Sequence, residues 1–181
     1  MPNWTENTLE IKGNEKYIAK FKKLANSKEL TTGVKTVLSF NSLYPMPKEL
    51  DDILSPPVIV SEKEYRKAIE KKNYGEKIDE LKGIPITKKI SQDLKKKFGA
   101  DNWYDWSNKH WGTKWDTSCA TLLDNKKKLQ YNFSSAWSPP VAWLQKVSKD
   151  FPELSFTLKF DEPAMGYRGE VKAKNGEIYE T

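Results

Sequence analysis

Apolar and polar residues alternate without a break from Leu154 to Phe160, and this is the most regular pattern in the chain. Strict alternation over this length is typical of a strand with one buried face, so the segment predicts a strand. The segments Tyr167–Lys172 and Glu177–Glu180 flank Asn175–Gly176, a dipeptide that favours a tight turn. The end of the chain is therefore predicted to be a strand followed by a hairpin.

At the beginning of the chain, the spacing of apolar residues changes from the alternation of a strand to the spacing of a helix. Leu9 and Ile11 alternate with polar residues and are followed by Gly13, which predicts a short first strand. Asn14 is a suitable helix cap, and apolar residues from Tyr17 to Ala25 recur at helical spacing. A helix is therefore predicted directly after the first strand.

The next segments predict a second strand and then a group of helices. The run Val34–Pro47 reads as a strand that is ended by its prolines. Ser61 and Glu64 have the spacing of a capping box, and Ile90–Gly99 has an apolar stripe at every fourth position before a terminal glycine. The segment Lys48–Trp115 is therefore predicted to be mainly helical.

Strand patterns return after this helical segment. Ala120–Leu122 and Leu129–Phe133 alternate on either side of a turn. Ser138–Pro140 predicts the start of a helix, with serine as the cap and proline in the first turn, and Pro152 ends it.

The order of these elements predicts an α+β fold. A ferredoxin-like antiparallel sheet of the split βαβ type, with helices on one face, accommodates this order. Residues 1–181 are predicted to form a single domain, in which residues 48–115 form a helical insertion between the second and third strands.

The segment Asp101–Trp115 concentrates four of the seven tryptophans, a tyrosine and the only histidine of the chain. Helical spacing divides these rings between two stripes. The first stripe contains Trp103, Trp106 and His110, and the second contains Tyr104, Trp111 and Trp115. Two interpretations stay open, because the rings either fill the core, as tryptophan usually does, or leave one face for stacking on a partner.

The composition excludes several classes of protein. No apolar run approaches the roughly 18 residues needed to span a bilayer, and the first residues lack the basic and apolar parts of a secretory signal. Cys119 is the only cysteine, so an intramolecular disulfide cannot form. We expect a cytoplasmic protein that does not contact a membrane.

The net charge of +6 is unevenly distributed along the chain. Ser61–Gly99 contains 12 Lys and Arg residues but only 7 Asp and Glu residues. This block favours acidic or phosphate-bearing partners, although a solvated helical face has the same composition. Arg66 and Arg168 are the only arginines, which disfavours sequence-specific DNA recognition because arginine supplies the bidentate contacts to bases.

The residue types favour binding over catalysis. A single histidine and a single cysteine do not make a typical zinc site, and the glycine-rich loops that bind nucleotides are missing from the sequence. We therefore expect a non-enzymatic protein without a cofactor or metal. Flat rings with nearby cations suit nucleotide bases and phosphates. The candidate ligand-binding residues are Trp103, Tyr104, Trp106, Lys109, His110, Trp111, Lys114, Trp115 and Arg168, although Arg168 also suits a surface ion pair.

Several stretches together carry a family resemblance: PNWTENTLEIKG, DNWYDWSNKHWGTKWD, YNFSSAWSPP and DFPELSFTLKFDEPAMGYRGEV. They resemble the YubB-like family of small proteins encoded by phages and plasmids. The resemblance covers both ends of the chain and the aromatic segment, whereas the basic block Ser61–Gly99 has no counterpart. Thr5 stands where relatives are expected to have cysteine, so a thiol role at this position is lost.

The resemblance implies a ferredoxin-like domain of mobile-element origin, and small phage proteins of this kind often counter host defences. The leading hypothesis is an accessory protein that binds a nucleotide-type ligand in an aromatic and basic pocket. The first alternative is a protein that inhibits a host defence enzyme through its helical insertion. The second is weak, non-specific binding of single-stranded nucleic acid. A homo-oligomer is compatible with the predicted sheet, because edge strands can pair between chains.

Overall fold

The computed structural model describes residues 3–28, 35–73, 83–125 and 127–180. The chain divides into two compact units. The first, Met1–Pro45 with Lys109–Thr181, is called the sheet unit below, and the second, Met46–Asn108, is called the helical unit.

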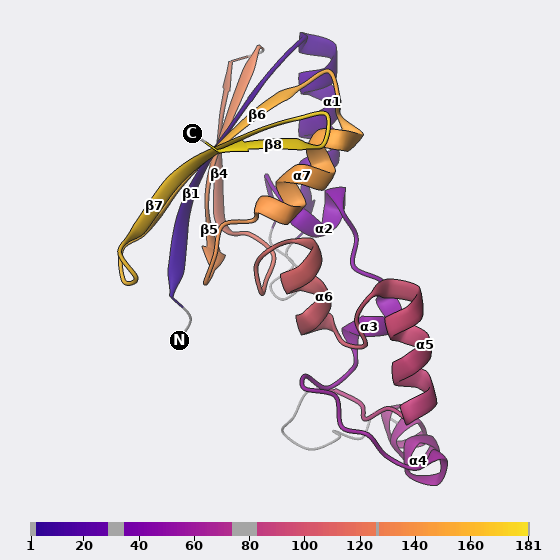
Figure 1. The fold of residues 1–181 in the computed structure, drawn as a ribbon. Coiled ribbons are helices and arrows are strands. Elements are labelled where there is room, and N and C mark those ends of the chain that lie inside the picture. Colours follow the sequence, from indigo (N-terminus) through magenta and orange to yellow (C-terminus); the bar gives the residue numbers. More distant parts are fainter. Residues whose placement is uncertain (1–2, 29–34, 74–82, 126, 181) are drawn as a thin grey trace. The chain divides into compact units, whose positions relative to one another are not determined.

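The sheet unit contains a six-stranded antiparallel sheet (Figure 1). Its spatial order is β4-β5-β1-β6-β7-β8, so β1 lies between two strands from much later in the chain. The strands are β1 (Trp4–Lys12), β4 (Ser118–Asn125), β5 (Lys128–Ala136), β6 (Ser155–Glu162), β7 (Tyr167–Lys174) and β8 (Glu177–Glu180).

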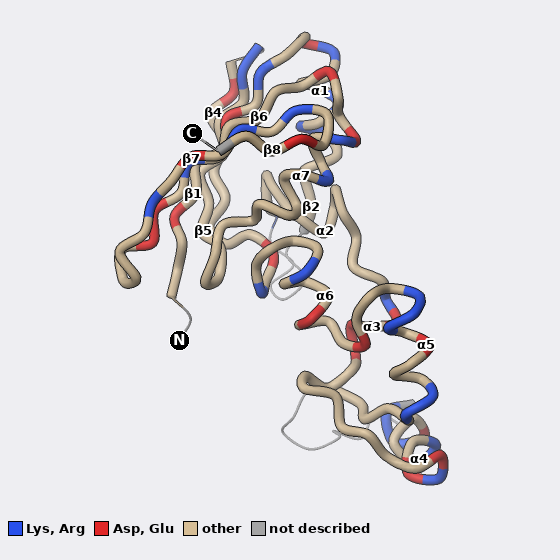
Figure 2. The backbone as a smooth tube through the Cα atoms, viewed as in Figure 1, with Lys and Arg blue, Asp and Glu red and all other residues tan. Residues whose placement is uncertain are grey.

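The two faces of this sheet differ because the strand residues alternate. Helices α1 (Glu15–Ala25) and α7 (Val141–Asp150) cover one face (Figure 1). Leu9 and Tyr131 on the sheet and Trp143 on α7 are fully buried in the core of this unit. Each such side chain contributes on the order of 1.5–3 kcal/mol by leaving water. In β1 the buried residues alternate with Glu6, Glu10 and Lys12, and charged residues recur along several strands of the sheet (Figure 2).

Many sequence predictions for this unit are confirmed. The segment Leu154–Phe160 lies in and just before β6, and Asn175–Gly176 forms the turn between β7 and β8. Asn175 and Gly176 have φ angles of 52° and 83°, the left-handed conformation that this dipeptide tolerates. Asn14 caps α1 by accepting a hydrogen bond from the backbone N–H of Lys16.

The prediction of a strand over Val34–Pro47 was wrong. Only β3 (Lys35–Thr36) is extended, and it pairs with β2 (Ser27–Lys28) in a separate two-stranded sheet. The chain then forms the short helix α2 (Phe40–Leu43). Among the described residues, this segment therefore adds no strand to the six-stranded sheet, and the split βαβ arrangement is not reproduced in the predicted form.

The physical reason is a cap supplied from a distant part of the chain. The half-buried carboxylate of Asp116 accepts hydrogen bonds from the backbone N–H groups of Phe40 and Asn41 and from the Ser39 hydroxyl. These contacts satisfy the free N–H groups at the start of α2. The apolar run alone contains no sign of them, because Asp116 lies 76 residues after Phe40.

Helix α7 starts differently from the prediction. Ser138 was expected to cap it, but its hydroxyl donates to the carbonyl oxygen of Gly112 at 2.5 Å. The residue at the cap position is Pro140, which forms no side-chain hydrogen bond there.

The helical unit contains α3 (Lys48–Asp51), α4 (Glu62–Asn73), α5 (Lys88–Phe98) and the larger part of α6 (Trp103–His110). The predicted capping box is present, since Ser61 and Glu64 exchange hydrogen bonds at the start of α4. Gly99 ends α5 with φ 75°, as its position in the sequence predicts. Asp101 is buried and accepts hydrogen bonds from Ser91 and Lys95.

The basic block is neutralised within its own unit. The helical unit contains 13 Lys and Arg residues and 12 Asp and Glu residues, whereas the sheet unit contains 18 and 13. Lysines of α4 and α5 form ion pairs inside the helical unit, namely Lys72–Asp52, Lys95–Asp101 and Lys97–Glu49. Most of the net positive charge of the protein therefore belongs to the sheet unit.

Among the described residues, no helix is both long and apolar enough to cross a membrane.

Candidate functional site

A basic pocket lies on the helix side of the sheet unit and has a volume of about 350 Å³. Four segments distant in sequence form it: the residue after α2, the end of α6, one side of α7 and the β7–β8 turn. Its side chains come from Tyr44, Lys109, His110, Gln145, Lys146 and Lys149. These residues are called the basic pocket below.

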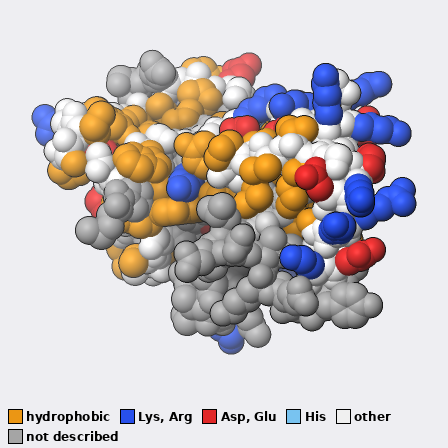
Figure 3. Space-filling view, turned by 90° about the horizontal axis from the view of Figure 1, so that it is seen from below, with side chains coloured by type: hydrophobic (Ala, Val, Ile, Leu, Met, Phe, Trp, Pro, Cys, Tyr) orange, Lys and Arg blue, Asp and Glu red, His pale blue; other side chains and the backbone are white. Residues whose placement is uncertain are grey.

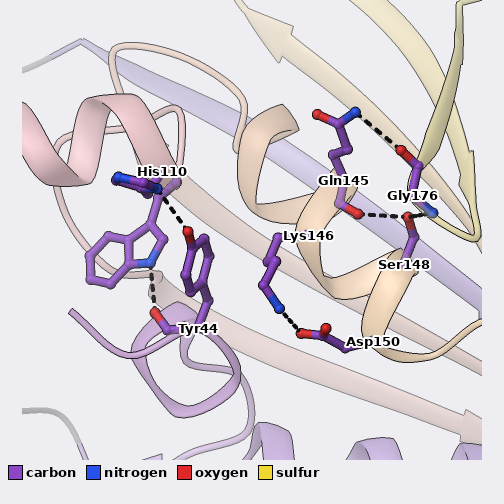
Figure 4. Close-up of polar contacts among 8 residues, drawn as sticks. Tyr44, His110, Gln145, Lys146, Ser148, Asp150 and Gly176 are labelled. Atoms are coloured by element: carbon purple, nitrogen blue, oxygen red, sulfur yellow. Dashed lines mark hydrogen bonds and ion pairs between the residues drawn. The ribbon is translucent and has the colours of Figure 1, made fainter. Parts of the chain in front are cut away.

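Tyr44 and His110 form the aromatic wall of the basic pocket (Figure 4). The Tyr44 hydroxyl and Nδ1 of His110 are 2.7 Å apart, and the two rings meet edge to face. When the hydroxyl donates to Nδ1, the imidazole hydrogen resides on Nε2, so that nitrogen is a hydrogen-bond donor. The indole N–H of Trp111 donates to the carbonyl oxygen of Tyr44 at 3.0 Å and fixes the backbone.

The phenol of Tyr44 remains protonated near neutral pH. Burial raises the pKa of Tyr44, and the nearby carboxylate of Asp150 raises it further, while the ammonium of Lys146 acts in the opposite direction. The ring therefore presents a neutral hydroxyl to His110.

Helix α7 supplies the cationic wall. Lys146 lies with its ammonium 5.4 Å from the centroid of the Tyr44 ring and forms an ion pair with Asp150 one turn later. Lys149 packs its methylene groups against Gly176, where a Cβ atom would come within 3.1 Å of Lys149 Cβ. The spacing of three residues places both lysines on the same side of the helix.

The β7–β8 turn is fastened to α7 by side-chain hydrogen bonds (Figure 4). The Gln145 amide donates to the carbonyl oxygen of Gly176 at 3.1 Å, and the backbone N–H of Gly176 donates to Ser148 Oγ at 3.1 Å. These contacts fix the β7–β8 turn, which forms one wall of the basic pocket, against α7.

This arrangement can hold an anion beside an aromatic ring. Three ammonium groups, a histidine and an amide surround the pocket, and Asp150 is the carboxylate that pairs with one of them. Within the described ranges, no three His, Cys, Asp or Glu side chains gather in a way that could hold a metal ion. The side chains that line the basic pocket offer charge attraction and hydrogen bonding.

A second hollow, of about 640 Å³, lies on the open face of the sheet. Glu6, Asp161 and Glu170 line it together with Lys159 and Arg168. Because carboxylates outnumber cations there, an anionic ligand is attracted to the basic pocket in preference to this hollow.

The predicted ligand-binding residues are divided between the two units. Trp103, Tyr104 and Trp106 belong to the helical unit. Trp106 is only 3% exposed, so its ring packs in the interior, whereas Tyr104 is 38% exposed.

The other predicted residues belong to the sheet unit. Lys109 and His110 line the basic pocket, whereas Trp111 is 4% exposed and supports it from behind. Trp115 lies elsewhere, with the ammonium of Lys114 over its ring. Arg168 lies on the open face of the sheet and forms no ion pair with any residue that the structure describes.

The predicted second aromatic stripe is not formed by one helix. Helix α6 ends at His110, and Gly112 follows with φ 82°, so the helical spacing stops before Trp115. Trp111 and Trp115 therefore do not continue the face that begins at Tyr104.

Sequence reasoning missed Tyr44, Gln145, Lys146 and Lys149. Tyr44 was assigned to a strand, so its ring was not considered as a partner for His110. The pair Lys146 and Lys149 was visible as a cationic stripe on the polar side of a predicted helix. Its proximity to His110 depends on the fold and has no local signal.

A comparison with known families assigns a class of domain to residues 110–181. Residues 110–181 match the family model described as the ferredoxin-like domain in Api92-like protein. This range includes α7 and strands β4 to β8, so an α+β ferredoxin-like domain built on an antiparallel sheet is confirmed.

One solved structure resembles the whole chain. It is the crystal structure of a protein api92 from Yersinia pseudotuberculosis, with 12% sequence identity and a TM-score of 0.54. The match covers 100% of this chain and 98% of that chain, and at this identity it shows the fold alone. No curated protein matches the sequence. The family match is limited to residues 110–181, and the YubB-like resemblance and a mobile-element origin stay predictions.

Proposed function

We propose that the protein binds a nucleotide-type ligand in the basic pocket without chemical turnover. The observation that carries this proposal is the convergence of Lys109, Lys146 and Lys149 with the hydrogen-bonded pair Tyr44 and His110 around one cavity. The lysines and the imidazole are suited to phosphate oxygens, and the Tyr44 ring offers an apolar edge to a base.

The size and the charge of the site support the same ligand class. Small-molecule sites usually measure roughly 300–1,000 Å³, so a cavity of about 350 Å³ suits a compact ligand such as a mononucleotide. The sheet unit contains five more Lys and Arg than Asp and Glu residues, which draws anions toward it over longer distances.

The proposal extends to the biological setting through the YubB-like resemblance. A protein that captures a nucleotide without converting it removes that molecule from its other partners. Such sequestration is one way in which a mobile-element protein counters a host defence, so we propose counter-defence as the role of this binding in the host cytoplasm.

A thermal-shift titration tests the ligand class directly. The purified protein is heated with nucleoside monophosphates, cyclic nucleotides, the matching nucleosides and inorganic phosphate, each at two salt concentrations. A nucleotide that binds the folded protein at about 100 times its Kd adds about 2.7 kcal/mol of stability. We expect the melting temperature to rise with a phosphorylated nucleoside and to remain unchanged with the nucleoside alone.

Two substitutions test whether the rise in melting temperature depends on the basic pocket. Lys149→Gln is expected to weaken the shift, whereas Lys159→Gln, on the open face of the same unit, is the matched control. The proposal is wrong if nucleosides without phosphate shift the melting temperature equally well, or if both variants lose the shift to the same extent. Conversion of the nucleotide during incubation would replace binding by an enzymatic role.

A further inference from the structure

Lys149 is a cation of the basic pocket whose side chain is held in place. Its methylene stem lies along the β7–β8 turn, since a Cβ atom added to Gly176 would come within 3.1, 3.4 and 3.5 Å of Lys149 Cβ, Cγ and Cδ. Within the described ranges, its ammonium forms no ion pair with a carboxylate. A side chain that is already ordered loses less conformational freedom when it binds a ligand. Lys149 is therefore prearranged to attract an anion.

The charged side chains around the basic pocket have a positive surplus. Lys109, Lys146 and Lys149 supply three ammonium groups, and Asp150, the ion-pair partner of Lys146, supplies a carboxylate. These four side chains together leave two positive charges. A phosphate monoester carries about −1.5 to −2 charges near pH 7, whereas each phosphate diester of a nucleic acid carries a single negative charge. The surplus therefore matches a terminal phosphate better than it matches a diester.

Stacking offers less in this pocket than charge does. The Lys146 ammonium lies over the Tyr44 ring, 5.4 Å from its centroid, and the ring of His110 meets the Tyr44 ring edge to face. Because Lys146 also lines the pocket, the cation covers the ring face on that side. A base therefore finds the edge of the Tyr44 ring and no open face, so its stacking energy is not realised.

Two other lysine-bearing surfaces are balanced by carboxylates. Figure 3 shows Lys and Arg side chains interspersed with Asp and Glu side chains on the face that it presents. In the helical unit Lys72 pairs with Asp52, and on the open face of the sheet Lys159 pairs with Glu170. A phosphate dianion is therefore attracted to the basic pocket in preference to these surfaces.

We propose that the basic pocket selects the dianionic phosphate monoester of a nucleotide over a monoanionic phosphate diester, and that the base contributes little to the affinity. This inference rests on the proposed nucleotide binding and adds the ester class and the part of the ligand that is recognised. Lys146 and Lys149 contact the phosphate oxygens from one side of α7. The Gln145 amide donates one N–H to Gly176 and offers its second N–H to the same phosphate.

Titration calorimetry of the full-length protein with a matched series of ligands tests this proposal. Adenosine 5′-monophosphate is compared with its methyl ester and with the 3′,5′-cyclic monophosphate, which are both monoanions with the same base. We expect both monoanions to bind about tenfold more weakly. The cyclic ester has no added methyl group, so its weak binding excludes a steric effect of that group. The 5′-monophosphates of adenosine, guanosine, cytidine and uridine are expected to bind within about threefold of one another.

A variant connects the discrimination to the fixed lysine. Lys149→Gln is expected to reduce the affinity ratio between the monophosphate and its methyl ester from about tenfold to about threefold. Lys159→Gln, on the open face of the sheet, is the matched control and is expected to keep the ratio. The melting temperatures of the free variants check that both are folded. A loss of overall stability does not change this ratio, so the ratio reports on the charge that Lys149 supplies.

The possible failures are distinguishable. If none of the phosphorylated compounds binds, the proposed nucleotide binding is wrong, and this inference is wrong with it. If the monophosphate, the methyl ester and the cyclic ester bind equally, nucleotide binding stands but the selection of a dianion is refuted. A preference of more than about tenfold for one base would refute the claim that charge determines the affinity. An unchanged ratio in the Lys149→Gln variant would also overturn the inference.

Discussion

At the residue scale, the Tyr44 hydroxyl connects the ring of the basic pocket to its only histidine. Its 2.7 Å contact with Nδ1 of His110 sets the orientation of the imidazole, and the Trp111 indole fixes the backbone of the same tyrosine. The orientation of the His110 imidazole is therefore controlled by a residue that comes 66 positions earlier in the chain.

Tyr44→Phe is predicted to weaken nucleotide binding about three- to tenfold. The phenyl ring keeps the apolar wall, but the imidazole loses the hydrogen bond that orients it, a loss of about 0.5–1.5 kcal/mol. Titration calorimetry of the variant measures this loss, with the melting temperature of the free protein as a check on folding. An unchanged affinity would show that the ligand does not depend on the orientation of His110.

A second residue-scale prediction concerns acid stability. Burial raises the pKa of Asp101, but hydrogen bonds from Ser91, Lys95 and Asn102 outweigh it and hold the pKa below that of an exposed aspartate. A lowered folded-state pKa gives stability that is complete above the unfolded-state pKa and is lost as the pH falls through the folded-state value.

Asp101→Asn is therefore expected to reduce the free energy of unfolding at pH 7 and to flatten its decline as the pH falls below about 4. Urea denaturation at a series of pH values measures both effects, and hydrogen exchange of the α5 amides locates them in the helical unit. An equally steep decline in the variant would contradict the assignment.

At the element scale, helix α2 depends on a carboxylate that belongs to another part of the chain. Asp116 accepts from the N–H groups of Phe40 and Thr117 at 2.5 and 2.7 Å and from the Ser39 hydroxyl at 2.6 Å. Since Tyr44 directly follows α2, the same cap positions one wall of the basic pocket.

Asp116→Ala is predicted to destabilise the sheet unit by about 2 kcal/mol, the upper part of the range for a lost helix cap, because the N–H groups it leaves are partly buried. Thermal unfolding measures the change. Nucleotide affinity is expected to fall as well, since Tyr44 loses its fixed position. Asp124→Ala, which removes an exposed ion pair with Lys22, is the control with little effect.

The elements differ in how far the sequence alone predicts them. Strands β1 and β6, helix α1 and the β7–β8 hairpin follow from periodicity and turn residues that lie within each segment. Helix α2 does not, because its local cap, in which Ser39 accepts from the Ser42 N–H, is joined by a tertiary contact with Asp116 that no local pattern indicates. The site divides in the same way, since Lys109 and His110 lie in the conspicuous aromatic segment, whereas Tyr44 and α7 reach them only through the fold.

At the scale of the whole molecule, the distribution of charge separates the two units. The Lys-rich block appeared in the sequence as the basic part of the protein, but its lysines balance carboxylates of the helical unit. The surplus belongs to the unit that contains the basic pocket.

Charge reversal tests this distribution. Lys146→Glu with Lys149→Glu is predicted to abolish nucleotide binding, whereas Lys96→Glu, on exposed α5, is expected to leave the affinity within about twofold. Calorimetry at low salt compares the two proteins under the conditions where long-range attraction is strongest. Equal losses in both would show that overall charge, and not the basic pocket, determines binding.

The position of β1 in the middle of the sheet has a consequence for how the protein is made. Asn7 of β1 and Ser135 of β5 are hydrogen-bonded although 128 residues separate them, and β6 follows still later. At translation rates of about 5–20 residues per second, β1 waits roughly 6–26 s after leaving the ribosome before its first neighbour exists. During that interval the nascent chain exposes an unpaired strand on both sides, which makes it a natural client for chaperones and a vulnerable target for proteases.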